Sequence, residues 1–311
     1  MPVLVIDKPL GLTSFAVVKS VARLLRRYRA AGGRGMPDPK RIGHGGTLDP
    51  MATGVLPVCV GEATKLAPFL LDADKAYEAV MKLGVHTDTL DAEGQVLHTR
   101  AVPPLSAGEI EATLARFVGP QHQVPPMYAA LKHQGKPLYA YAREGQEIER
   151  QPRALTIFEL VLQRFEPPDV VGFSVRCSKG TYVRVLASDL GNALGTCAHL
   201  VGLRRTLSGP FSLAQAMTLA ELEARAEASE SLPSVSLAEA LRHHAQVALT
   251  ATLVDRVTKG QKLPWSEVDP EGALGHGHVA LLRPDGSLVA VASRAVDGMA
   301  SFHRVFNPEV V

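Results

Sequence analysis

The residue best placed to do chemistry in this chain is Asp49, an aspartate in a glycine-rich loop. It follows Gly43, Gly45 and Gly46 and stands directly before Pro50. Glycine allows positive φ and a close approach of the backbone to a ligand, while proline keeps the preceding residue out of the helical region. Such a loop presents a carboxylate instead of packing it. The same residues also suit a tight turn in which the aspartate caps a helix, so composition alone leaves two interpretations open.

Four further segments carry polar side chains in patterns that packing does not require. Residues 61–65 (GEATK) end in a lysine, and residues 75–77 (KAY) begin a strand. Residues 83–94 (LGVHTDTLDAEG) form an acidic turn, and residues 177–184 (CSKGTYVR) pair an aromatic side chain with a cation. A single tyrosine or lysine in such places indicates little, since half-buried aromatics and solvated cations are common. The combination of the segments is what carries information.

Length and composition indicate an ordinary globular protein. The chain has 311 residues, of which 46% are hydrophobic, enough for one large domain and a small one. There is no run of 18 apolar residues, and Asp7 and Lys8 come too early for a signal-peptide core, so we expect a cytoplasmic protein without a membrane segment. The three cysteines, Cys59, Cys177 and Cys197, lie far apart, so we expect neither disulfides nor a metal site, and no cofactor.

The charge of the chain is concentrated near its N-terminus. Residues 1–45 contain nine lysines and arginines against two aspartates, a local charge of +7 in a chain whose net charge is +2. Such an asymmetry is typical of a surface that binds a phosphate backbone. A solvated helix face explains the same run of basic residues equally simply.

The elements around Asp49 can be predicted from hydrophobic spacing. Residues 3–6 (VLVI) read as a short buried strand, and a helix follows that is capped by Thr13 or Ser14 and runs to about Arg29. A loop rich in glycine and proline, residues 30–40, then leads into the Asp49 loop. We therefore expect the basic helix and the Asp49 loop to be neighbours.

Farther along the chain, strands and helices alternate irregularly. Residues 77–82 and 155–177 show the alternation of strands, with a capped helix predicted at 106–117. This order favours an α+β domain on a mixed sheet. Residues 219–244 read as a helical connector, and the chain from residue 245 reads as short strands separated by turns. These patterns predict two domains, residues 1–244 and residues 245–311.

The Asp49 loop and the four segments, together with residues 123–132 (QVPPMYAALK) and 199–211 (HLVGLRRTLSGPF), resemble the bacterial TruB-type tRNA pseudouridine synthases in order and spacing. The resemblance runs from about Val5 to Phe211. It implies a pseudouridine synthase catalytic domain on a mixed, largely antiparallel sheet, and a C-terminal PUA-like RNA-binding domain. The implied reaction is the isomerisation of uridine 55 in the T arm of tRNA to pseudouridine, without a guide RNA.

The resemblance also implies a role for particular residues. Asp49 is the essential carboxylate, and Arg184 pairs with it and keeps it ionised. Tyr77 stacks on the target base near the proton removed from C5, and Tyr182 lines the same pocket. His44 contacts the nucleotide that is flipped out of the folded arm. Lys65 and Lys19 are further candidates for contacts with a phosphate or the pocket, and Leu203 for the apolar wall of the pocket.

Several alternatives stay open at this point. The sequence does not choose between attack of the carboxylate on the base, attack on C1′ of the ribose, and proton abstraction from C2′ to give a glycal. A guide-RNA-dependent synthase and a non-catalytic protein that binds structured RNA are the two competing functions. With the stand-alone enzyme we expect a monomer that binds tRNA and needs no obligate protein partner.

Overall fold

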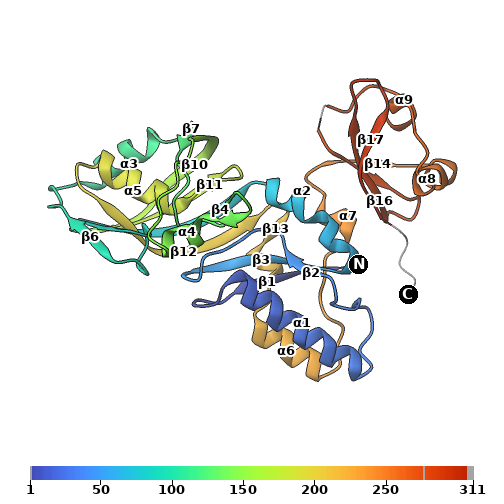
Figure 1. The fold of residues 1–311 in the computed structure, drawn as a ribbon, viewed down its shortest axis with the longest axis horizontal. Helices are drawn as coiled ribbons and strands as arrows, with labels where there is room; N and C mark the ends of the chain where they lie inside the picture. Colours follow the sequence, from blue (N-terminus) through green and yellow to red (C-terminus); the bar gives the residue numbers. More distant parts are fainter. Residues whose placement is uncertain (1, 276, 307–311) are drawn as a thin grey trace.

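Most of the chain is built on one large mixed sheet. The computed structural model describes residues 2–275 and 277–306, and in them nine strands form this sheet, with the main order β1-β3-β12-β4-β11-β10-β7, while β2 pairs with β3 and β13 with β12 (Figure 1). The strands are β1 (Val3–Lys8), β2 (Ile42–His44), β3 (Ala52–Val60), β4 (Lys75–Leu83), β7 (Gly119–Gln123), β10 (Arg153–Glu166), β11 (Val170–Cys177), β12 (Ala198–Ser208) and β13 (Phe211–Ser212). Only the β3–β12 pairing among them is parallel, so the predicted α+β fold on a mixed, largely antiparallel sheet is confirmed.

Two pairs of helices pack on this sheet and create two separate cores. Helix α1 (Ser14–Ala30) lies against α6 (Leu219–Glu227), whereas α3 (Ala107–Ala115) lies beside α5 (Val183–Ala193) toward the other end of the sheet (Figure 1). Tyr77 on β4 and Leu203 on β12 pack against both cores. These two side chains therefore mark the junction between the halves.

The predicted N-terminal helix is confirmed, and its basic residues have mixed surroundings. The Thr13 hydroxyl accepts a hydrogen bond from the backbone N–H of Ala16 at 3.0 Å, which caps α1 as expected. Arg27 forms exposed ion pairs with Glu223 and Glu227 of α6. Part of the basic run is thus paired within the protein, and exposed pairs of this kind stabilise a fold only weakly.

The remaining elements of this part are short. The helical ones are η1 (Gly61–Leu66), α2 (Ala67–Asp72), α4 (Leu138–Arg143) and η2 (Leu213–Gln215). Two small hairpins are formed by β5 (Val85–Thr87) with β6 (Val96–Thr99), and by β8 (Lys132–His133) with β9 (Lys136–Pro137).

The predicted helical connector over residues 219–244 is only partly helical. After α6 the chain is extended, and Val235 exchanges two backbone hydrogen bonds of 2.9 Å with Val3 of β1. Ser229 at φ 56° and the proline at 233 end helical geometry here. Helix α7 (Leu237–Ala240) then leads out of this region.

The chain beyond residue 245 forms its own four-stranded sheet and core, set to one side of the large sheet (Figure 1). Its elements are β14 (Ala245–Ala248), α8 (Ala251–Thr258), α9 (Trp265–Val268), β15 (Val279–Leu282), β16 (Leu288–Arg294) and β17 (Ala300–Val305). The predicted β-rich character of this part is confirmed. Helix α8 was not predicted; Thr250 caps it, and its Val257 is buried in the core. Residues 307–311 of the predicted domain lie outside the described residues.

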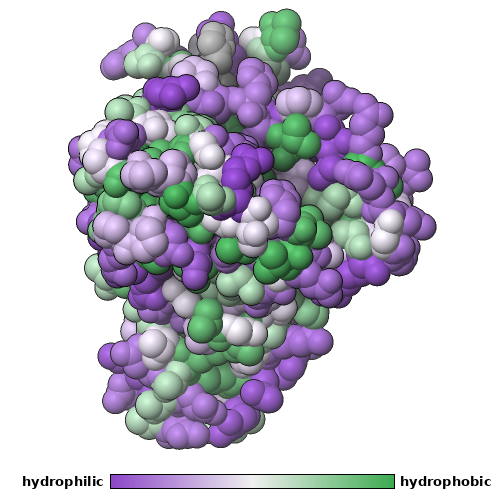
Figure 2. Space-filling view, turned by 90° about the vertical axis from the view of Figure 1, so that its left-hand side faces the viewer, coloured by the Kyte–Doolittle hydropathy of each residue, from purple (hydrophilic) through white to green (hydrophobic). Residues whose placement is uncertain are grey.

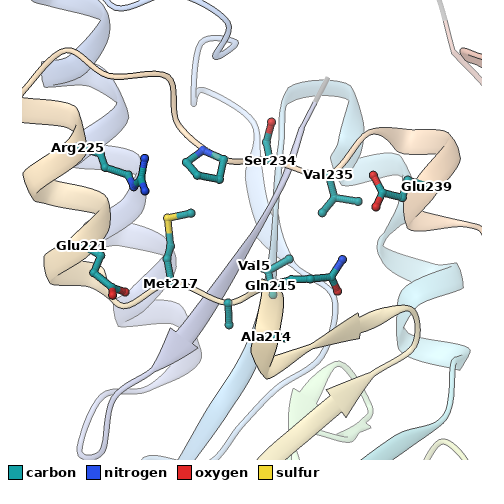
Figure 3. Close-up of a pocket in the computed structure, with 11 residues that line it drawn as sticks. Val5, Ala214, Gln215, Met217, Glu221, Arg225, Ser234, Val235 and Glu239 are labelled. Atoms are coloured by element: carbon teal, nitrogen blue, oxygen red, sulfur yellow. The ribbon is translucent and has the colours of Figure 1, made fainter.

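Asp49 does not line either of two large cavities on the surface of the described residues. One, of about 520 Å³, lies between α6, the segment 214–217 and the extended connector (Figure 3). The other, of about 630 Å³, is lined by Glu78 and Arg204 and also by Met51 and Leu203. On the end of the molecule shown in Figure 2, hydrophilic residues predominate and hydrophobic ones form small separate patches.

In the part of the chain that the structure describes, no helix is long and apolar enough to cross a membrane.

Candidate active site

Asp49 and Arg184 come together between the Asp49 loop and the first turn of α5. The loop connects β2 to β3, and Nε of Arg184 lies 3.0 Å from Oδ2 of Asp49. The arginine side chain is 4% exposed, whereas the Asp49 side chain is 35% exposed. The carboxylate is therefore accessible from outside on a rigid support, which is the arrangement that the glycine-rich loop predicted.

Arg184 is fixed by more than Asp49. It donates hydrogen bonds to the carbonyl oxygens of Thr89 at 2.7 Å and Tyr128 at 2.8 Å. Its Nη1 also lies 3.4 Å from Oδ2 of Asp91, a carboxylate that is as buried as the arginine. A planar guanidinium held at several nitrogens has one orientation, so it aims Asp49 as well as compensating its charge.

Asp91 was missed by the sequence analysis as a site residue. The acidic turn at residues 83–94 was noted, but several acids in it had equal claims. Only the fold shows that the Asp91 carboxylate lies next to Arg184. The same carboxylate accepts hydrogen bonds from the Thr89 hydroxyl and the Glu93 N–H, which fix its position in the turn.

Opposing effects set the ionisation of Asp49. Burial raises its pKa, and the Asp91 carboxylate adds to this, whereas the Arg184 guanidinium lowers it through charge and a hydrogen bond. The net shift is upward, so Asp49 ionises at higher pH than an exposed aspartate does. Without Arg184 the pKa of Asp49 would be higher still.

Both predicted tyrosines lie near this pair. Tyr77 projects from β4 at the junction of the two cores and is half-buried. Tyr182 is the N-cap residue of α5, and its backbone is held by the Gln123 side chain through hydrogen bonds of 2.9 and 3.2 Å. Burial is the main cause of the raised pKa of both phenols, and the Asp49 charge adds to it, so both hydroxyls are neutral at physiological pH.

His44 is on a strand rather than in a free loop. His44 is the last residue of β2 and pairs with Val58 of β3, just as Ile42 and Gly43 pair with neighbouring positions of the same strand. Its Nδ1 accepts a hydrogen bond of 3.4 Å from the Gly46 N–H. Burial, helped by the nearby Arg205 cation, lowers its pKa, so the imidazole is neutral at physiological pH and can contact a nucleotide by hydrogen bonding or stacking.

The three weaker candidates fall in three different places. Leu203 lies at the sheet junction, opposite Ala52 of β3 and Ala79 of β4. Lys19 is exposed on α1, with its ammonium 4.6 Å from the centre of the Phe15 ring. The Lys65 ammonium is engaged with Glu62 and donates a hydrogen bond of 2.9 Å to the Val305 carbonyl of β17. Lys65 thus links η1 to the C-terminal sheet, and these contacts give it a structural role.

Lys8 was not predicted, although it is fully buried beside the Asp49 loop. Its ammonium donates hydrogen bonds to three carbonyl oxygens, those of Pro9, Leu12 and Pro50. Burial lowers its pKa to about 8, and the Asp49 charge opposes this. A lysine at the end of a strand ordinarily indicates a solvated position, so no sequence signal identified it.

In residues 2–275 and 277–306, no group of three or more histidine, cysteine, aspartate or glutamate side chains is arranged to hold a metal ion.

Comparisons with known proteins show which family this fold belongs to. Residues 34–183 match the family model "TruB family pseudouridylate synthase (N terminal domain)", and residues 184–246 match "tRNA pseudouridylate synthase B C-terminal domain". The first match contains Asp49 and Tyr77, and the second begins at Arg184. Fold and site thus define a pseudouridine synthase.

Individual relatives agree on which group of synthases this is. A curated tRNA pseudouridine synthase B of Burkholderia mallei is 48% identical over 305 residues, which cover 97% of this chain and 96% of the relative. The counterpart in Cupriavidus pinatubonensis is 45% identical over 280 residues, covering 89% and 85%. The chain belongs to the TruB family of pseudouridine synthases.

Solved structures are similar over almost the whole chain. A protein in the crystal structure of a Cbf5-Nop10-Gar1 complex superposes with a TM-score of 0.75 at 26% identity, covering 99% of this chain and 85% of that chain. A second, in an H/ACA RNP bound to a substrate RNA, has a TM-score of 0.72 at 25% identity.

Proposed function

We propose that this protein converts uridine 55 in the T arm of tRNA to pseudouridine, without a guide RNA. The observation that carries the proposal is the partly exposed Asp49 carboxylate paired with buried Arg184, in a chain 48% identical to enzymes named tRNA pseudouridine synthase B. The pair supplies the ionised carboxylate that the reaction needs.

The reaction breaks the bond between N1 of uracil and C1′ of ribose and forms a bond between C5 and C1′. The proton on C5 is released, and the base gains a proton on N1. No electrons enter or leave, so neither a redox cofactor nor an energy source is needed. A carboxylate can add to the sugar or base and leave again, or stabilise an electron-poor sugar during the exchange.

The neighbouring residues receive complementary roles in this proposal. Arg184 keeps Asp49 ionised and aimed, and Tyr77 stacks on the base at the sheet junction. Tyr182 and Leu203 line the pocket. His44, neutral and near the loop, contacts the flipped nucleotide, whose extrusion costs a few kcal/mol of unstacking. The exposed Lys19 is available to a phosphate, whereas the contacts of Lys65 compete with such a role.

We further propose that residues 1–244 form the catalytic domain and residues 245–311 a PUA-like domain that binds RNA. The separate sheet beyond residue 245, which has a core cluster of its own, supports this division. A further cluster, in which Ala280 and Val291 pack with Val3 and Val55, joins the two parts. The protein acts as a monomer in the cytoplasm, where its tRNA substrate is found, and needs no protein partner.

A guide-dependent reaction is the second candidate, favoured by the likeness to a protein in the H/ACA RNP structure. The test uses a naked T-arm stem-loop carrying tritium on C5 of its uridines. Release of one tritium per RNA by the purified protein, and none from the same RNA with cytidine at position 55, supports the proposal. Tight binding without release contradicts it and leaves the guide-dependent and non-catalytic functions.

A further inference from the structure

The side chain that stands out beyond the site described so far is Arg205 of β12. It is 1% exposed and heads the largest fully buried side chains of the described residues. Within the part of the chain that the structure describes, no carboxylate lies within salt-bridge distance of it. A buried cation without an acidic partner is costly unless its N–H groups are well bonded, so a residue of this kind calls for a structural reason.

The reason lies in the carbonyl oxygens that it holds. Nη2 donates to the Gly46 carbonyl at 3.0 Å, and Nη1 donates to the Thr47 carbonyl at 3.3 Å. Nε donates to the Val55 carbonyl at 2.8 Å. Gly46 and Thr47 precede Asp49, whereas Val55 follows it on β3. One planar guanidinium therefore ties together the two arms of the loop that presents Asp49.

The other carbonyl oxygens of the loop are bonded as well. Each of the next three accepts a hydrogen bond from a different group, namely Leu48 from the Ser14 hydroxyl, Asp49 from the Ala52 N–H, and Pro50 from Lys8 and the Gly11 N–H. The backbone on both sides of the carboxylate is thus held at consecutive positions. Arg205 holds the first two of them.

The surrounding backbone is shaped to fit this arginine. At Gly54 the φ angle is 103°, and a Cβ atom there would lie 2.2 Å from the Arg205 carbonyl oxygen. At Gly46 the φ angle is 151°, and a Cβ atom would lie 3.4 Å from Nη1 of Arg205. Glycine at these two positions lets the loop approach both the main chain and the guanidinium of Arg205.

Arg205 also faces Tyr77. The two residues are directly opposite each other in the antiparallel pairing of β12 with β4, so their side chains project from the same face of the sheet. Burial raises the pKa of the Tyr77 phenol, and the Arg205 guanidinium opposes that rise through its charge and a hydrogen bond. The same cation is therefore the cross-strand neighbour of the proposed base-stacking residue.

We propose that Arg205 is a positioning residue that fixes Asp49 and Tyr77 relative to each other by binding the Gly46 and Thr47 carbonyls while facing the phenol. It touches neither the substrate nor the reacting atoms. The inference rests on the proposed function, because Asp49 and Tyr77 need a fixed relative position only if they act together in that reaction. A small displacement between the two residues slows the reaction more than it weakens RNA binding.

The test compares Arg205→Met and Arg205→Lys with Leu114→Ala, a core substitution in α3 chosen as a control for lost stability. Each variant is first checked for a native circular dichroism spectrum, its melting temperature is measured, and assays are run well below that temperature. Single-turnover tritium release with saturating T-arm RNA is expected to fall about 100-fold in Arg205→Met and less in Arg205→Lys. RNA affinity stays near that of the wild type, and Leu114→Ala keeps its rate.

A second readout is independent of activity. With 3-fluorotyrosine in place of tyrosine, the ¹⁹F resonance of Tyr77 is identified by its loss in Tyr77→Phe. That resonance is expected to shift in Arg205→Lys, a variant that keeps the positive charge. If Arg205→Met does not fold, Arg205→Lys alone tests whether Arg205 positions Tyr77. An unmoved resonance, or a folded Arg205 variant with the wild-type rate, overturns the inference. Inactive wild-type protein together with a shifted resonance instead rejects the proposed function and keeps the contact.

Discussion

Arg184 lies between two carboxylates, with Nε 3.0 Å from Asp49 and Nη1 3.4 Å from Asp91, and only Asp49 is open to solvent. The two acids affect the site in opposite ways from the arginine. Arg184 lowers the pKa of Asp49, and Asp91 raises it. The ionisation of the proposed catalytic group is thus a balance that substitutions can move in either direction.

Replacing the arginine is expected to move the acid limb of the reaction toward higher pH. The reaction needs ionised Asp49, so the rate falls as pH drops through the pKa of that group. Burial already raises this pKa, and Arg184→Gln removes the main opposing charge, so the rate is lost at higher pH than in the wild type. The measurement is the single-turnover rate against pH. An unchanged acid limb would contradict the assigned role of the pair.

Asp91→Asn is expected to shift the acid limb toward lower pH while slowing the reaction. The amide removes a negative charge that raises the pKa of Asp49, and it weakens the support of Arg184. We expect the rate at its pH optimum to fall roughly 10-fold or more, because the arginine loses part of its fixed orientation. Asp169→Asn, at an exposed pair with Lys82, is the control. Equal rates for both variants would show that Asp91 is dispensable.

Gly54→Ala is expected to destabilise the fold by about 3 kcal/mol. Its φ of 103° is unfavourable for alanine, and the new Cβ would lie 2.2 Å from the Arg205 carbonyl oxygen. Gly43→Ala is the matched control, since a Cβ there meets nothing within 4 Å, and its stability should change by less than about 1 kcal/mol. Urea unfolding of both variants measures the difference. Similar stabilities would mean that the close approach at Gly54 is easily relieved.

The elements next to Asp49 could be predicted from the sequence because their signals are local. Hydrophobic spacing and a threonine cap predict α1, and a serine followed three residues later by glutamate predicts α3. Residues 219–244 were less predictable, since the extended connector is stabilised by its pairing with Val3, far away in the sequence. Helix α8 was missed because turn residues around it suggested short strands.

The buried cations were the part of the site that sequence reasoning could not find. Lys8 and Arg205 donate hydrogen bonds to backbone carbonyl oxygens. The sequence of side chains does not indicate which backbone carbonyls need a partner. Asp91 was hidden among several acids of one turn. Lys19, proposed for a phosphate or pocket contact, lies on α1 over the Phe15 ring, where an anion can reach it.

The most direct test of the account is single-turnover tritium release from a T-arm stem-loop labelled at C5 of uridine, comparing the wild type with Asp49→Asn. The substitution keeps the shape of the side chain and removes its negative charge. We expect complete release by the wild type and none by Asp49→Asn, with RNA binding retained. Equal release by both proteins would contradict it and show that another group performs the chemistry.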